Sequence, residues 1–75
     1  MISQSIDTRG LSCPLPMMKA SSGMEALLAG QMLEVFSLDP ESFRDMDALC
    51  RSTGNTLLSS KDQIDRSYRF LIEIN

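Results

Sequence analysis

Two prolines set two residues apart, Pro14 and Pro16, determine where the first helix of this chain can begin. Proline lacks a backbone N–H and breaks a helix interior, but the first turn tolerates it because that N–H would have no partner there. The prolines therefore predict a helix from Pro14 to about Leu28, followed by Gly30 as a left-handed C-terminal cap. The same argument places Cys13 at the N-cap or directly beside it. The core-facing side of this helix is predicted to consist of Met17, Ala20, Met24 and Leu27 or Leu28.

Strand patterns surround this helix. Residues 2–8 alternate in polarity, which is typical of a half-buried strand, and residues 32–38 are almost continuously apolar, as in an inner strand. Residues 56–61 predict a third strand, residues 62–66 the turn of a hairpin, and residues 67–74 the last strand. The last strand alternates between one face with Tyr68, Phe70, Ile72 and Ile74 and another with Arg69, Leu71 and Glu73.

A second helix is predicted after residues 32–38. Asp39 is a capping residue and Pro40 follows it in the first helical turn, with Ser42 as a second candidate for the cap. Gly54 closes this helix. Its apolar face is predicted to consist of Phe43, Met46, Leu49 and Cys50.

The resulting element order is β-α-β-α-β-β within one domain, residues 1–75. Each helix has a single apolar stripe, so both are expected to cover one face of a four-stranded sheet. We therefore expect a two-layer α/β sandwich with a mixed sheet. What covers the other face of the sheet is left undecided by the sequence. The strands hold more apolar surface than two short helices easily cover: Leu33, Val35, Leu57, Leu58 and Leu71.

Composition narrows the function classes. The net charge is −3 and the seven Lys and Arg residues are scattered, which disfavours direct nucleic-acid binding. No leader pattern and no membrane-spanning run is present, so we expect a cytoplasmic protein without membrane insertion. The chain has no histidine, which rules out histidine-dependent dyads and triads within it. With two cysteines only, a zinc site is poorly supported, and no metal or cofactor is expected.

Cys13 is the candidate reactive group. The free N–H groups of Leu15 and Met17 and the positive end of the helix dipole all favour its thiolate, which is the reactive form. Arg9, four residues earlier across the flexible Gly10, either adds positive charge or points into solvent. The residues alone leave a second interpretation open, in which Cys13 is merely a small residue at a capping position.

Cys50 points to a different role. It shares the apolar face of the second helix with Phe43 and Met46, where cysteine behaves as a small apolar residue, so we expect it to be buried and structural. A disulfide with Cys13 requires their Cα atoms to lie within about 7 Å, and nothing in the sequence demands this. Met18 is expected to be exposed beside Cys13, where it offers an apolar contact for a partner.

Several segments together resemble the family of small bacterial TusA/SirA-like sulfur carrier proteins. These are "RGLSCPLP" (9–16), "LEV" (33–35), "DPES" (39–42), Asp45, Cys50, "GN" (54–55) and "YRFLI" (68–72). The resemblance covers residues 5–74, and the CPxP element at the start of the first helix is its specific part. It implies a fold similar to the C-terminal domain of bacterial translation initiation factor three.

The resemblance also implies a function. In such proteins the cysteine matching Cys13 takes sulfane sulfur as a persulfide from a cysteine desulfurase or a rhodanese-like donor, and passes it to an acceptor protein. Arg9, Gly10, Pro14 and Pro16 would support this site. A partner would contact Leu15, Met18 and Lys19. The family implies a relay rather than a stand-alone enzyme. The oligomeric state stays open, although a carrier that docks on two partners in turn works well as a monomer.

The resemblance leaves the pathway open. Branches of the family serve tRNA 2-thiouridine synthesis, sulfur oxidation, molybdenum-cofactor enzymes, thiosulfate uptake and selenium metabolism. Many members carry several Lys or Arg residues along the first helix, whereas residues 17–28 here keep only Lys19. This departure leaves room for a donor or acceptor that differs from the tRNA-thiolation pair.

Two other function classes remain alongside the carrier. One is a binding or regulatory module for protein or RNA, in which Cys13 is only a helix cap. The other is a redox thiol pair of Cys13 and Cys50, which the expected burial of Cys50 weakens.

Overall fold

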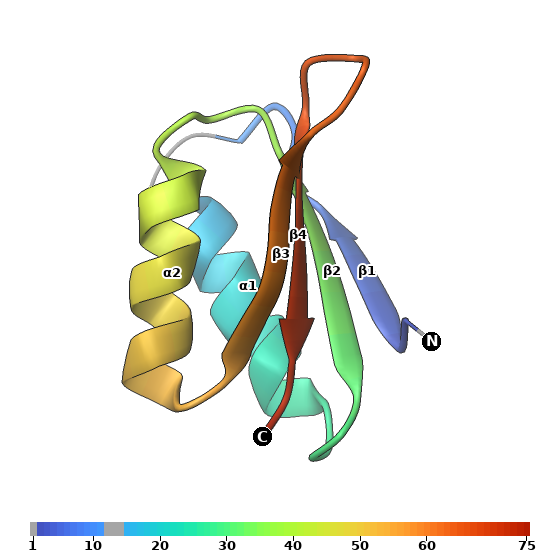
Figure 1. Cartoon of the computed structure of the whole chain (residues 1–75), viewed down its shortest axis with the longest axis vertical. Helices are drawn as coiled ribbons and strands as arrows, with labels where there is room; N and C mark the ends of the chain where they lie inside the picture. Colours follow the sequence, from blue (N-terminus) through green and yellow to red (C-terminus); the bar gives the residue numbers. More distant parts are fainter. Residues whose placement is uncertain (1, 12–14) are drawn as a thin grey trace.

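The chain follows the predicted order of strands and helices. The computed structural model describes residues 2–11 and 15–75. Its elements are β1 (Gln4–Asp7), α1 (Leu15–Ala26), β2 (Met32–Ser37), α2 (Ser42–Thr53), β3 (Thr56–Asp62) and β4 (Tyr68–Glu73). Figure 1 shows both helices on the same side of one four-stranded sheet, which confirms the predicted two-layer α/β fold.

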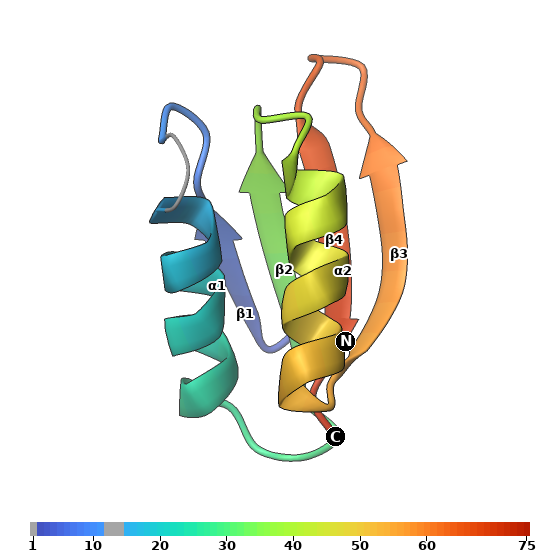
Figure 2. The same ribbon diagram turned by 90° about the vertical axis from the view of Figure 1, so that its left-hand side faces the viewer.

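The sheet is mixed and has the strand order β1-β2-β4-β3. β1 pairs with β2 in parallel, with Ile6 opposite Val35, because α1 carries the chain back across the sheet between them. β4 pairs antiparallel with both β2 and β3, and so lies between two strands that precede it. The view in Figure 2, turned by 90°, shows α1 over the β1 side of the sheet and α2 over the β4 side.

The core lies between the sheet and the two helices. Strand alternation puts Leu33 and Val35 of β2, and Phe70 and Ile72 of β4, on the helix side, where all four are fully buried. The helices contribute four further core residues, Ala20, Met24, Met46 and Cys50, and Ile74 after β4 completes the cluster. The predicted alternation of the last strand is thereby confirmed for its apolar face.

The first helix ends earlier than predicted. It stops at Ala26 rather than near Leu28, whose side chain is 74% exposed. The backbone N–H of Leu28 donates instead to Oε1 of Gln31 at 2.7 Å, and that of Gly30 to the Ile74 carbonyl at 2.7 Å. Gly30 has the predicted positive φ, +88°, but it sits in the turn to β2 and does not cap the helix directly.

The second helix ends at the predicted glycine but begins later than predicted, because α2 starts at Ser42 and its N-cap residue, Glu41, makes no side-chain capping bond. Oδ1 of Asp39 accepts a hydrogen bond from the Glu41 N–H at 3.0 Å, which caps the turn that leads into α2. Ser42, the second candidate for the cap, makes no such bond: it is buried, and its Oγ lies 2.7 Å from Oγ of Ser37. Gly54 closes the helix with φ +79°, as predicted.

The second face of the sheet, left open by the sequence, is covered by charged and polar side chains. Three of the apolar side chains in question pack on the helix side of the sheet and so are absent from this second face: Leu33, Val35 and Leu57. Across the open face Arg69 pairs with Glu34, which also accepts a hydrogen bond from Ser5 at 3.0 Å. The remaining apolar side chains there, on β2 and β4, are half-buried: Met32, Phe36 and Leu71.

Within residues 2–11 and 15–75, none of the helices has the length and apolar character needed to cross a membrane.

Candidate functional site

The predicted reactive residue Cys13 and its neighbour Pro14 lie outside the described residues. The structure describes the two segments that lead to them. Residues 8–11 arrive from β1, and α1 departs at Leu15. Both segments lie at the same end of the molecule as the β2–α2 loop and the β3–β4 turn (Figure 1).

The segment before Cys13 is a tight turn anchored on β2. Thr8 is fully buried, and both its backbone N–H and its hydroxyl donate to the Phe36 carbonyl. The Leu11 N–H then donates to the Thr8 carbonyl at 3.0 Å, which closes a four-residue turn. Gly10 occupies its third position with φ +88°, a conformation that a side chain would strain. Gly10, expected from the sequence to be a flexible position, therefore allows the backbone to form this turn.

The Arg9 side chain is held by hydrogen bonds to two carboxylates and does not point freely into solvent. Its Nε and Nη2 donate to the two carboxylate oxygens of Asp7, each at 2.9 Å, and Nη1 donates to Oδ2 of Asp65 at 3.2 Å. Its Cζ lies 5.6 Å from the centroid of the Phe36 ring. We call these three charged residues the Arg9 clamp.

The clamp shifts the acidity of its members. Hydrogen bonds that Arg9 donates to Asp7 lower the pKa of the Asp7 carboxyl to about 2, and the same side-chain bonds raise the pKa of the Arg9 guanidinium. The pKa of Asp65 is also lowered, chiefly because its Oδ1 accepts bonds from the hydroxyl and the N–H of Ser67 at 2.6 and 3.0 Å. All three groups therefore keep their charges at neutral pH.

Beyond Cys13, the first turns of α1 present apolar side chains to the outside. Leu15 is 43% exposed and Met18 58% exposed, as the sequence predicts for Met18. Pro16 is buried against the fold, so it anchors the helix start that it was predicted to define. The three candidate partner-binding residues, Leu15, Met18 and Lys19, all lie along one groove.

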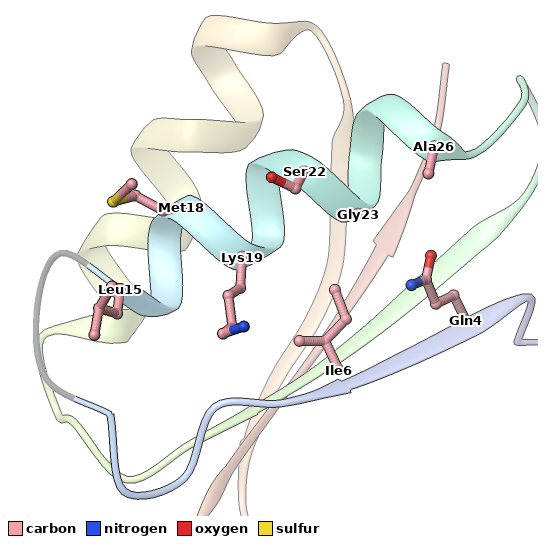
Figure 3. A pocket seen from close by; sticks show the side chains of 8 residues that line it. All are labelled: Gln4, Ile6, Leu15, Met18, Lys19, Ser22, Gly23 and Ala26. Carbon is pink, nitrogen blue, oxygen red and sulfur yellow. The ribbon is translucent and has the colours of Figure 1, made fainter.

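This groove runs between α1 and β1 and has a volume of about 500 Å³. Figure 3 shows Ile6 rising from β1 toward the helix and Lys19 descending from the helix beside it. The helix approaches closely at Gly23, where an added Cβ would lie 2.6 Å from Cδ1 of Ile6. Among the described residues that line the groove, Lys19 is the only charged one. The others are Gln4, Ile6, Leu15, Met18, Ser22, Gly23 and Ala26.

Cys50 is buried as predicted. Its side chain is 2% exposed and packs in the core. Burial, with a smaller contribution from the charge of Asp47, raises the pKa of its thiol to about 11. At neutral pH Cys50 is therefore a neutral thiol without access to solvent, which makes it a poor nucleophile.

Sequence reasoning missed the partners of Arg9. Asp7 stands two residues before Arg9, a spacing that could have suggested a local ion pair. Asp65 gave no such signal, because it lies 56 residues away in the chain. Phe36 was assigned only to the inner strand, and its position under the guanidinium follows from the β1–β2 register.

No cluster of three or more His, Cys, Asp or Glu side chains suited to a metal ion occurs in the described part of the chain.

Comparison with known proteins gives a consistent result. Residues 4–74 match the family described as "Sulfurtransferase TusA". A "Sulfur carrier protein TusA" from Allochromatium vinosum is 41% identical over 70 residues, which cover 93% of this chain and 91% of the relative. One of the same name from Pseudomonas putida is 34% identical over 58 residues, covering 77% and 72% of the two chains.

A solved structure has the same fold. The crystal structure of a SirA-like protein from Desulfitobacterium hafniense superposes with a TM-score of 0.85, covering 93% of this chain and 95% of the other. The two sequences are 20% identical, so this likeness concerns the fold alone.

Proposed function

Because the chain belongs to the TusA family of sulfur carrier proteins, we propose that it carries sulfane sulfur as a persulfide on Cys13 and relays it to an acceptor protein. The observation that carries the proposal is the family match over residues 4–74, which includes the CPxP element at the start of α1. Residues 1–75 would act as a single sulfur-carrier domain, a relay rather than a stand-alone enzyme.

The chemistry consists of two exchanges at sulfur. The Cys13 thiolate attacks the terminal sulfur of a donor persulfide, the donor S–S bond breaks, and the donor leaves as a thiolate. Cys13 then holds a persulfide. An acceptor thiolate attacks that terminal sulfur, the Cys13 S–S bond breaks, and Cys13 is released as a thiolate. Electrons balance in both steps, so neither an oxidant nor a cofactor is required.

The surroundings of the motif support this role. The positive end of α1 begins two residues after Cys13, and a helix N-terminus favours thiolate and persulfide anions over their neutral forms. Cys50 competes poorly for sulfur because it is buried and its thiol pKa is raised to about 11. The same burial argues against a redox pair of Cys13 and Cys50.

We expect donor and acceptor to dock on the exposed first turns of α1. Leu15, Met18 and Lys19 lie on one groove that begins two residues from Cys13. Exchange between two protein thiols needs surface access and not a deep pocket, which an open groove allows. The partner side is expected to be a cysteine desulfurase or rhodanese-like donor and a downstream acceptor protein, with the carrier acting as a cytoplasmic monomer and without direct contact to nucleic acid or membrane.

The finer pathway is set by the acceptor. The family's routes include tRNA 2-thiouridine synthesis, thiosulfate uptake and selenium metabolism, and the first helix of this chain has only Lys19 where many relatives carry several basic residues. Docking on a mainly apolar helix face favours a partner surface that is not strongly acidic. Measuring sulfur transfer from the loaded carrier to acceptor proteins of each route would distinguish between these routes.

Intact-mass measurement tests the carrier function. After incubation with a cysteine desulfurase and cysteine, the protein should gain about 32 Da per sulfur bound, an adduct that a reducing thiol removes. Cys13→Ser should abolish the gain, whereas the matched control Cys50→Ser should keep it. The proposal fails if wild-type protein gains no sulfur from desulfurase or rhodanese-like donors, or if the adduct survives Cys13→Ser.

A further inference from the structure

The Arg9 clamp joins three segments that are far apart in sequence. Asp7 is the last residue of β1, Phe36 lies on β2, and Asp65 belongs to the turn between β3 and β4. Asp65 is itself fixed, because its Oδ1 accepts both the hydroxyl and the backbone N–H of the buried Ser67. Arg9 is thus bonded to a residue of the β3–β4 turn that is itself held by Ser67.

Arg9 lies on the sheet face that the helices leave open. Val35 and Ser37 are buried on the helix side, and successive side chains of a strand alternate between faces, so Phe36 points the other way. The guanidinium stacks on Phe36 and therefore lies on the opposite side of the sheet from α1. This position directs its charge away from the start of that helix.

The charges of the clamp also argue against direct electrostatic help to a thiolate. One guanidinium faces two ionised carboxylates, so Asp7, Arg9 and Asp65 together carry one net negative charge. The lowered pKa values of Asp7 and Asp65 keep both carboxylates ionised throughout the range in which thiols titrate. A group of this sign does not favour a second anion nearby.

What Arg9 does hold is the backbone. Its own N–H donates to Oδ1 of Asp7 at 3.0 Å, and it occupies the second position of the turn closed by the Leu11 N–H. A bidentate contact with Asp7 and a third bond to Asp65 fix the orientation of this residue more strictly than a single ion pair would. The turn that precedes Cys13 is thereby tied to the β3–β4 turn.

We propose that Arg9 is a positioning residue for sulfur transfer: through Asp7 and Asp65 it holds the Thr8–Leu11 turn, from which the chain runs to Cys13, and it acts through this geometry and not through its charge. The inference rests on the proposed function of Cys13. This positioning role differs from direct binding of an anion by the guanidinium, which the sequence motif alone would suggest just as well.

The test compares Arg9→Gln, which removes the charge, with Arg9→Lys, which keeps the charge but loses the planar fork. Asp65→Asn weakens the clamp from its other end, and Arg51→Gln makes the same charge change at an exposed ion pair on α2. Thermal unfolding confirms that each variant is folded. The Cys13 thiol pKa is taken from the pH dependence of iodoacetamide alkylation, in a Cys50→Ala background.

For a positioning residue, transfer from a protein persulfide donor should slow about tenfold or more in both Arg9→Gln and Arg9→Lys, because small misplacements are costly in rate. Reaction with a small-molecule persulfide should stay near the wild-type rate, and the thiol pKa should move by well under about one unit. Asp65→Asn should slow protein transfer in the same sense, and Arg51→Gln should leave it unchanged.

Two results would overturn the proposal. If Arg9→Lys transfers like wild type while Arg9→Gln raises the thiol pKa by about one unit or more, Arg9 acts by charge. If all Arg9 and Asp65 variants transfer like wild type, the clamp has no role in transfer.

A separate readout keeps this inference distinct from the carrier function itself. The Leu11 amide, bonded to the Thr8 carbonyl, should exchange with solvent deuterium about tenfold faster in Arg9→Gln and Arg9→Lys than in Arg51→Gln. Failure of the wild-type protein to take up any sulfur refutes the carrier function, whereas unchanged Leu11 exchange in the Arg9 variants refutes the clamp.

Discussion

Cys50 shows how surroundings decide the chemistry of a thiol. It is 2% exposed within the core, and burial raises its pKa to about 11, so almost none of it is thiolate at neutral pH. Cys13 follows the Thr8–Leu11 turn in the chain and precedes α1 by two residues, and we propose it as the residue that exchanges sulfur. The apolar pattern around Cys50 correctly predicted its burial, which leaves the proposed exchange chemistry to Cys13.

The raised pKa of Cys50 makes stability depend on pH in the alkaline range. The unfolded chain releases this proton near the ordinary pKa of 9.0 and the folded chain only near 11, so between these values the unfolded state binds fewer protons. The free energy of unfolding should therefore fall as pH rises through this window. Cys50→Ala removes this contribution while costing about 1 kcal/mol or more at lower pH through the cavity it leaves.

Urea unfolding at about pH 8 and about pH 10.5, in a Cys13→Ser background, checks this. The stability gap between the parent and its Cys50→Ala variant should narrow at the higher pH. A gap of constant size would contradict a titrating buried thiol.

At the scale of elements, the contact of α1 with β1 depends on Gly23. The helix lies so close to the strand that an added Cβ would meet Cδ1 of Ile6 at 2.6 Å and the methyl groups of Leu33 at 3.3 Å. Glycine lowers helix propensity by about 1 kcal/mol relative to alanine, so its presence in mid-helix requires a packing reason. Close approach to the sheet is that reason, and it also sets the width of the groove.

Gly23→Ala should therefore destabilise the fold by about 1–2 kcal/mol, because overpacking outweighs the gain in helix propensity. Ile6→Val removes the Cδ1 atom that clashes most strongly, and should recover part of this loss in the double variant. Chemical denaturation of the four proteins of this cycle measures the coupling. Additive effects of the two substitutions would show that Ile6 is not the group that Gly23 accommodates.

The elements were largely predictable because their signals are local. Proline and glycine positions, and the periodicity of apolar residues, located both helices and all four strands to within a few residues. The misjudged details depend on contacts between distant segments. The end of α1 is set by Gln31 and Ile74, and Ser42 turns inward to Ser37 rather than capping its helix. Likewise, no local pattern pairs Arg9 with Asp65.

At the scale of the whole molecule, the segments on either side of the proposed transfer site lie at the opposite end from the C-terminus (Figure 1). Residues 8–11 and the start of α1 lie at one end, and the C-terminus lies at the other (Figure 1). There Nδ2 of Asn75 donates to the Gly54 carbonyl at 2.7 Å and to Oγ1 of Thr56 at 2.8 Å. The Asn75 N–H also donates to Oδ1 of Asn55 at 3.0 Å, so the end of the chain closes on the α2–β3 turn.

Asn75→Ala should lower the free energy of unfolding by about 1 kcal/mol or less, because two side-chain hydrogen bonds are lost at an exposed site. The alkylation rate of Cys13 and its sulfur loading should stay at wild-type values, since the substitution is remote from residues 8–11. Differential scanning calorimetry and intact-mass loading assays measure the two quantities on the same samples. A parallel loss of loading would show that the two ends are coupled.

The Arg9 clamp joins the turn before the motif to a residue that is synthesised 56 positions later. Asp65 emerges long after Arg9, and β4 must insert between β2 and β3 before the sheet that carries both residues is complete. A nascent chain that already displays its motif cysteine therefore still lacks the contact that orients the turn before it. With the role we propose for Arg9, the order of synthesis delays completion of the clamp until the β3–β4 turn has formed.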